Sequence, residues 1–108
     1  MINALAIYGT LAPGAPNHHV VADIHGSWMK GTVNGYLHNE GWAAEHGYPA
    51  ITLDPDGPEV EVDLLVSDEL EQHLTRLDDF EGWNYKRVTA EVETAHGMHI
   101  AYIYALAN

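Results

Sequence analysis

The sequence predicts an α+β domain, in which a small, curved and mostly antiparallel sheet packs against one main helix. The first observation is a series of about six short apolar or alternating segments, separated by turns rich in glycine and proline. The second is a single long stretch of helical periodicity after Ser67. The third is a pair of glycines, Gly31 and Gly35, inside one strand, which indicates bulges or sharp curvature, as in a small closed sheet. A length of 108 residues, 46% of them hydrophobic, suits a single domain over residues 1–108.

The first predicted strand is residues 4–8 (ALAIY), a short apolar run between Asn3 and Gly9. The segment YGTLAPGAPN that follows contains two glycines and two prolines, which predict a loop. A loop of this kind can present consecutive backbone N–H groups to an anion, although it is more often a simple turn. Residues 20–24 are predicted to form one turn of helix.

The middle of the chain is predicted to alternate between strands and loops. Residues 28–37 form a strand, 38–48 a polar loop, 48–51 a short extended piece and 54–58 a turn. Residues 60–66 (VEVDLLV) alternate at first and are then wholly apolar, which is typical of a strand that enters the core.

The main helix has a clear start and a clear end in the sequence. Ser67 is a favourable N-cap, and Asp68 and Glu69 follow it where the helix dipole favours negative charge. The helix is expected to run to about Phe80 and to end at Gly82. Beyond it, residues 85–94 and 98–106 are predicted to form a hairpin around a turn at 96–97.

One carboxylate falls on the apolar stripe of this helix. Counting back from Glu81 in steps of four, three and four gives a stripe that faces the core, formed by Leu77, Leu74 and Leu70. A carboxylate directed at apolar surroundings is costly unless it is paired, protonated or functional. Burial there should raise the pKa of Glu81 towards neutrality. Asp79 is expected in solvent, and Asp78 at the border of the stripe, as a surface charge or as an anchor for backbone.

Composition excludes several classes of function. A formal net charge of −12 repels phosphate backbones and anionic lipids, so neither nucleic acid nor membrane is expected as a partner. The absence of cysteine excludes disulfides, thiolate zinc sites and cysteine nucleophiles. No stretch has the length of a membrane span or the pattern of a signal peptide, so a cytoplasmic location is expected. The few basic residues are the ones available to an anionic ligand: Lys30, Arg76, Lys86 and Arg87.

Three histidines, His18, His19 and His25, raise the possibility of a metal site. Adjacent histidines point in different directions, and no HxH, HxxxH or CxxC spacing accompanies them. We therefore expect no metal, and an exposed or helix-start role for these side chains is the simpler interpretation.

Two motifs taken together carry a family resemblance. YGTLAPG follows the first strand, and LDDFEG precedes Tyr85-Lys86-Arg87. The order and spacing resemble the gamma-glutamylcyclotransferase-like family, which includes the gamma-glutamylamine cyclotransferases. The pattern of that family is a YGSL- or YGTL-type loop, then LDxxEG, then YxR. The matching positions are Tyr8, Gly9, Thr10, Leu11 and Gly14, then Leu77, Asp78, Phe80, Glu81 and Gly82, then Tyr85 and Arg87, with 48–50 similar to a YPA piece of the family.

The resemblance implies a β-barrel-like fold with a central cavity and a reaction that needs no cofactor. The substrate would be a small γ-glutamyl amine, amino acid or peptide, from which ring closure releases 5-oxoproline. Glu81 would be the general acid/base, and the protein would act as a monomer or small homo-oligomer. The implied substrate-binding residues are Tyr8, Gly9, Thr10, Leu11, Tyr85 and Arg87, and further tyrosines that are candidates for lining the cavity are Tyr36 and Tyr104.

One departure from the family pattern bears on function. Many members carry a Gly-Glu pair in the strand before the helix, whereas this chain has VEVDLLV there. No role is carried over to Glu61 or Asp63. The departure leaves an alternative open, in which the same fold is a small-molecule binding or regulatory module without turnover.

Overall fold

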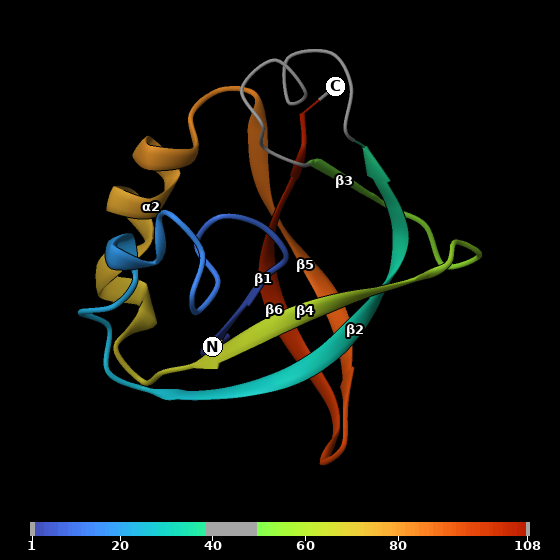
Figure 1. The fold of residues 1–108 in the computed structure, drawn as a ribbon, viewed down its shortest axis with the longest axis horizontal. Helices are drawn as coiled ribbons and strands as arrows, with labels where there is room; N and C mark the ends of the chain where they lie inside the picture. Colours follow the sequence, from blue (N-terminus) through green and yellow to red (C-terminus); the bar gives the residue numbers. More distant parts are fainter. Residues whose placement is uncertain (1, 39–49, 108) are drawn as a thin grey trace.

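A computed structural model describes residues 2–38 and 50–107, and Figure 1 shows the arrangement of their helices and strands. The elements in chain order are β1 (Ala4–Ile7), the 3₁₀ helix η1 (His18–Val20), β2 (Ser27–His38), β3 (Ala50–Leu53), β4 (Glu59–Val66), the 3₁₀ helix η2 (Leu70–His73), α2 (Leu74–Glu81), β5 (Tyr85–Thr94) and β6 (Gly97–Leu106). No helix in the described part of the chain is long and apolar enough to cross a membrane.

The six strands form one mixed sheet that closes on itself. Their order is β3-β2-β4-β1-β6-β5, and an additional pairing between β2 and β5 completes the barrel. The pairing of β1 with β6 is parallel, and the other pairings among the described strands are antiparallel. The predicted α+β class, with a mostly antiparallel, barrel-like sheet and one main helix, is therefore confirmed.

Closure depends on the long strand β2, which changes partner along its length. Residues 27–34 pair with β4, residues 35–38 pair with β3, and Gly31 also faces Thr94 on β5. A Cβ atom at Gly31 would lie 2.6 Å from Cγ1 of Val92, which is too close for any side chain. The glycines thus permit close approach of strands, while β2 itself remains continuous from Ser27 to His38.

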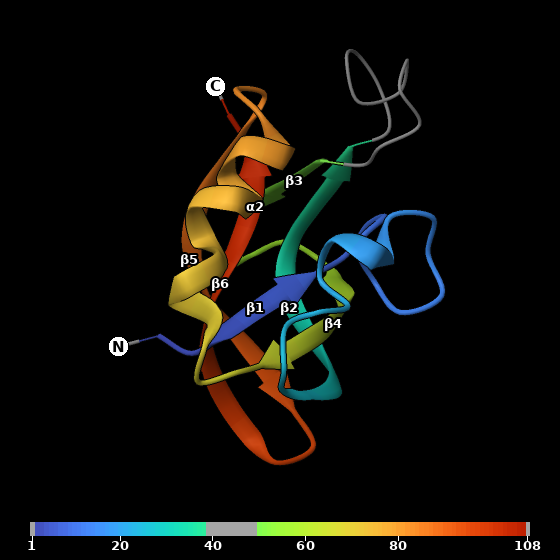
Figure 2. The same cartoon turned by 90° about the vertical axis from the view of Figure 1, so that its left-hand side faces the viewer.

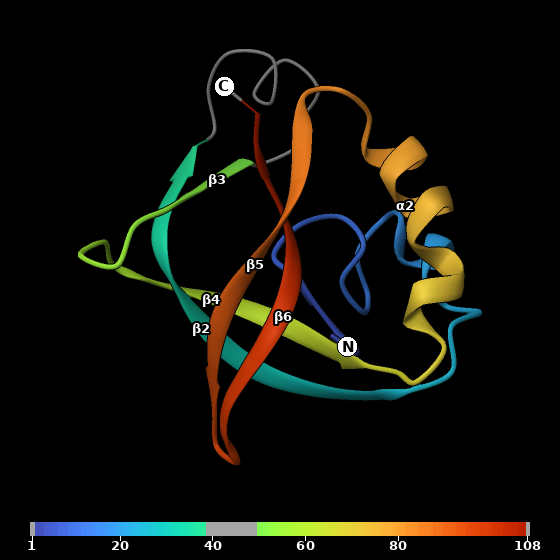
Figure 3. The ribbon, with the colours of Figure 1, turned by 180° about the vertical axis from the view of Figure 1, so that it is seen from behind.

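The barrel has an apolar interior and a second apolar layer on its outside. Strand β1 contributes side chains to both layers. Ala4 and Ala6 point into the barrel, whereas Leu5 and Ile7 point towards α2 and the loop after β1. The outer layer contains the leucine stripe of the helical segment: Leu70, Leu74 and Leu77. Figure 2 shows α2 alongside the barrel, and Figure 3 shows the β5–β6 hairpin from behind.

The helical segment differs from the prediction at its start. Its first turn is the 3₁₀ helix η2, and α2 begins only at Leu74. Ser67 accepts a hydrogen bond of 3.2 Å from the N–H of Glu69, but its own hydroxyl donates to the carbonyl of His25, so it joins two segments. The predicted end is confirmed, because Gly82 follows Glu81 with φ +78°.

Two other boundaries differ from the expectations. The helical turn predicted at 20–24 occurs earlier, as η1, and continues as hydrogen-bonded turns to Ile24. His38, predicted to start a loop, is the last residue of β2. The rest of that loop and the YPA-like residues Tyr48 and Pro49 lie outside the described residues. Ala50 begins β3, and the turn at 54–58 is closed by a 2.9 Å bond from the N–H of Gly57 to the carbonyl of Asp54.

Candidate active site

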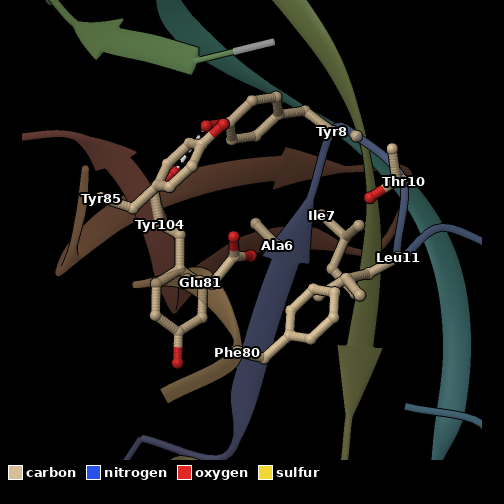
Figure 4. Close-up of a pocket in the computed structure, with 10 residues that line it drawn as sticks. Ala6, Ile7, Tyr8, Thr10, Leu11, Phe80, Glu81, Tyr85 and Tyr104 are labelled. Atoms are coloured by element: carbon tan, nitrogen blue, oxygen red, sulfur yellow. Dashed lines mark hydrogen bonds between the residues drawn. The ribbon is translucent and has the colours of Figure 1, made fainter. Parts of the chain in front are cut away.

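A cavity of about 170 Å³ lies between the loop after β1 and the end of α2. Figure 4 shows the side chains around it. Its walls come from β1 and the following loop, from the last turn of α2, and from β5 and β6. The lining residues are Ala6, Ile7, Tyr8, Gly9, Thr10, Leu11, Phe80, Glu81, Tyr85 and Tyr104.

Glu81 directs its carboxylate into this cavity, opposite Ala6 of β1 (Figure 4). It is half-buried and makes no hydrogen bond or ion pair with any described residue. Burial raises the pKa of the Glu81 carboxyl to about 7, because a low-dielectric wall disfavours the charged form. The helix position that spacing assigns to the inward stripe therefore carries an unpaired group able to gain or lose a proton near neutral pH.

The opposite wall is the start of the loop after β1. The carbonyl of Gly9 accepts from Ala12 at 3.2 Å, but the N–H groups of Gly9, Thr10 and Leu11 donate to no described residue. Consecutive free N–H groups beside a cavity can bind a carboxylate or a developing oxyanion. The loop that the sequence singled out thus meets Glu81 across one cavity.

Asn17 and His18 hold this loop in place. Asn17 donates through its backbone to the carbonyl of Thr10 at 2.8 Å, and through its side chain to the hydroxyl of Thr10 at 3.1 Å. Nδ1 of His18 donates to the carbonyl of Leu11 at 3.0 Å, and its ring lies 5.5 Å from the ring of Trp28. These bonds engage the carbonyls of Thr10 and Leu11 and so restrain the loop.

The tyrosines of the site have different surroundings. The hydroxyl of Tyr8 donates to the carbonyl of Tyr104 at 2.6 Å and accepts from the N–H of Ile51 at 3.2 Å. Burial raises the pKa of Tyr8 well above its usual value. Tyr8 therefore lines the cavity with its ring, while its hydroxyl joins three strands. Tyr36 is exposed and does not line this cavity.

Arg87 lies next to the cavity. Its Nε is 3.3 Å from Oδ1 of Asp78, and its guanidinium is 4.8 Å from the ring centre of Tyr102. The hydroxyl of Tyr104 donates to the same Asp78 oxygen at 2.7 Å. Asp78, expected either as a surface charge or as an anchor for backbone, instead anchors two side chains. Asp79 is exposed, as expected from its place on the helix.

The other candidate residues lie elsewhere. Asp63 pairs with Lys30 at 2.7 Å, and neither it nor the exposed Glu61 lines the cavity, so the departure in that strand lies away from Glu81. His18 is engaged by the loop, and His19 and His25 are exposed. Within residues 2–38 and 50–107, no group of three or more histidine, aspartate or glutamate side chains is placed to hold a metal ion.

Sequence reasoning missed several residues that shape the site. Ala6 and Ile7 line the cavity but look like ordinary core positions in the sequence, and Phe80, which belongs to the LDDFEG motif, was assigned no role in the site. Asn17 was also missed, although an asparagine beside a Pro/Gly-rich loop is a common anchor for turn backbone. The site therefore includes residues that lie outside the two motifs that predict it.

Comparison with known proteins identifies the family of the chain. The model of the family described as "Gamma-glutamyl cyclotransferase, AIG2-like" matches residues 5–108 of this chain. No curated protein matches.

Two solved structures illustrate the likeness of the fold. YkqA from Bacillus subtilis is 28% identical with a TM-score of 0.77, over 98% of this chain and 36% of its own. An AIG2-like protein from Mus musculus is 29% identical with a TM-score of 0.77, over 98% of this chain and 78% of its own. The chain thus spans about a third of YkqA and most of the mouse protein. The resemblance predicted from the motifs is confirmed, and the chain belongs to the gamma-glutamyl cyclotransferase, AIG2-like family.

Proposed function

We propose that this protein is a γ-glutamyl cyclotransferase that releases 5-oxoproline from a small γ-glutamyl amine, amino acid or peptide. The observation that best supports this function is the Glu81 carboxylate, which has no partner among the described residues and shares a cavity with a loop whose Gly9, Thr10 and Leu11 N–H groups donate to no described residue. Family membership supports the reaction class, and the geometry supports the assignment of roles.

The reaction is an intramolecular aminolysis. The neutral α-amino nitrogen of the substrate attacks its own γ-carbonyl carbon, so a C–N bond forms and the carbonyl becomes an oxyanion. The amine then loses one proton, the bond to the original amide nitrogen breaks, and that nitrogen gains one proton. Because the nucleophile belongs to the substrate, the protein needs only to hold it folded and to move a proton.

Glu81 suits the proton transfer. As a carboxylate it takes the proton from the attacking amine, and as a carboxylic acid it returns one to the leaving nitrogen. A pKa of about 7 keeps both forms accessible near neutral pH. An ordinary glutamate, with a pKa near 4.3, would be a much weaker base.

The loop N–H groups of Gly9, Thr10 and Leu11 fit two roles on the substrate. They can hold its α-carboxylate, or they can stabilise the oxyanion that forms at the γ-carbonyl. The rings of Tyr8 and Tyr85 would contact the γ-glutamyl chain. Each role places the substrate between the loop and Glu81.

The test is release of 5-oxoproline from a panel of γ-glutamyl compounds. We expect wild type to be active and Glu81→Gln to lose at least about 10²-fold in kcat, as general acid–base residues typically contribute. Asp79→Asn is the matched control, because it removes an exposed carboxylate from the same helix and should leave kcat unchanged. Equal activity of wild type and Glu81→Gln would remove Glu81 from the mechanism.

The same panel separates catalysis from simple binding. A binding module would be stabilised against heat by γ-glutamyl compounds without forming 5-oxoproline. Turnover by wild type would exclude that alternative.

A further inference from the structure

A second, polar cavity adjoins the first beyond Tyr85 and Tyr104, which line both. Its other lining residues are Asp78, Gly82 and Arg87. Since Glu81 precedes Gly82, a group leaving the γ-glutamyl carbon towards this side would stay within reach of the acid/base.

The first cavity is small for a whole substrate. Its volume of about 170 Å³ is below the range of roughly 300–1,000 Å³ typical of complete ligand sites. A γ-glutamyl head between the loop and Glu81 would therefore leave the departing group to occupy adjoining space. The second cavity provides that space, with polar walls.

Arg87 has unused donors in this second cavity. Its Nε faces Asp78 and one face of its guanidinium lies over Tyr102, but its terminal nitrogens contact no described partner. Oδ1 of Asp78, by contrast, already lies next to both the Tyr104 hydroxyl and Arg87. Asp78 thus contacts one edge of the planar guanidinium and Tyr102 contacts one face. The remaining N–H groups form a fork that can bind a carboxylate with two parallel hydrogen bonds.

The other cations of the chain are directed elsewhere. Lys30 pairs with Asp63. Arg76 contacts the carbonyl of Val20, Asp23 and His73. Lys86 is exposed and, by strand alternation, points to the opposite face of β5 from Arg87. In a chain of net charge −12, an anionic leaving group would thus depend on Arg87.

We infer that the second cavity is the leaving-group subsite and that Arg87 binds the α-carboxylate of a departing amino acid. The inference rests on the proposed cyclotransferase function. It narrows the substrate class to γ-glutamyl amino acids, in which a free α-carboxylate lies next to the scissile bond. γ-Glutamyl amines without that carboxylate would be poorer substrates.

The experiment compares γ-glutamyl-alanine with γ-glutamyl-alaninamide, which has the same shape without the charge. We expect wild type to prefer γ-glutamyl-alanine in kcat/KM by roughly 10- to 100-fold, as expected for hydrogen bonds to a charged group. Arg87→Gln should bring that ratio close to one, and Arg87→Lys should retain part of it. Lys86→Gln is the matched control and should keep the wild-type ratio.

Two results would overturn the inference. One is a wild-type ratio near or below one. The other is a loss in Arg87→Gln that is equal for both compounds, because a purely structural role through Asp78 would lower both alike.

A binding measurement separates this inference from the proposed function. If wild type released no 5-oxoproline, the proposed function would fail, and calorimetry would still compare the two compounds. Tighter binding of γ-glutamyl-alanine that disappears in Arg87→Gln would support the subsite, and equal binding of both compounds would reject it.

Discussion

The hydroxyl of Tyr8 donates a hydrogen bond of 2.6 Å to the carbonyl of Tyr104, a residue that lies 96 positions later in the sequence. The same hydroxyl accepts from Ile51, so a single oxygen atom joins the end of β1 to β6 and β3. The side chain of Tyr104 then continues the connection to Asp78, one turn before Glu81. The two walls of the cavity are thereby held at a fixed separation.

Tyr8→Phe should therefore destabilise the protein. It removes two bonds and leaves a carbonyl and an N–H without their partner, which costs about 1–3 kcal/mol in free energy of unfolding. Denaturant unfolding monitored by circular dichroism measures the loss. Tyr36→Phe, at a side chain that is 47% exposed, is the control and should change stability little. An unchanged unfolding midpoint in Tyr8→Phe would show that these bonds contribute no net stability.

Glu81 should make stability depend on pH in an unusual direction. Its pKa is about 7 in the folded protein and near 4.5 when unfolded, so the folded state binds more protons between these values. Wild type should consequently lose stability as pH rises from 4.5 to 7, whereas Glu81→Gln lacks this component. At pH 8 we expect Glu81→Gln to be more stable by up to roughly 3 kcal/mol, with the difference vanishing near pH 4. A difference that is constant with pH would contradict the raised pKa.

Activity should follow the same ionisation. In the proposed mechanism the unprotonated carboxylate accepts the amine's proton, so kcat/KM should rise with pH through about 7. Initial rates of 5-oxoproline formation between pH 5 and 9 measure this profile. Asp79→Asn should reproduce the wild-type midpoint. A rising limb centred near pH 4.5 would mean that Glu81 titrates as an ordinary exposed glutamate.

Gly82→Ala should impair activity as well as stability. A Cβ at Gly82 would meet nothing within 4 Å, so the obstacle is conformational: φ +78° with ψ −173° is a region that is essentially restricted to glycine. The cost should be about 1–3 kcal/mol. The change lies next to Glu81, so we also expect kcat to fall. Gly97→Ala, at φ +107° in the β5–β6 turn, is the control, with a comparable loss of stability and normal kcat per folded molecule.

The local features of this fold were predictable because short-range rules govern them. Helical spacing placed Glu81 on the inward stripe, Gly82 ended the helix, and alternation oriented β5. Gly31 and Gly35 indicated a curved, closed sheet, but the way in which the sheet closes was not predictable from these rules, since β2 changes partner along its length and approaches Val92 at Gly31 only after folding. The predicted start of the α-helix was also wrong, because the hydroxyl of Ser67 donates to the carbonyl of His25 and no α-helix begins there.

The site was predictable in part for the same reason. The loop and Glu81 were found through motifs, and their meeting across one cavity could be expected from the family. The second cavity was not expected: Arg87 and Tyr104 were named as candidate site residues and Asp78 as a border position, but they lie on three different elements, and sequence spacing does not bring these together. Their partnership is a property of the closed sheet.

The central place of β1 has a consequence for how the chain acquires its structure. This strand is the first in sequence, yet it pairs on one side with β4 and on the other with β6, the last strand. To bring such distant segments together, the chain must lose conformational entropy before their contacts stabilise it. We therefore expect folding on a timescale of about milliseconds to seconds. During synthesis the N-terminal strand would remain exposed on one edge until β6 emerged from the ribosome. The cavity beside Glu81, which is lined by residues of β1 and β6, would therefore form late.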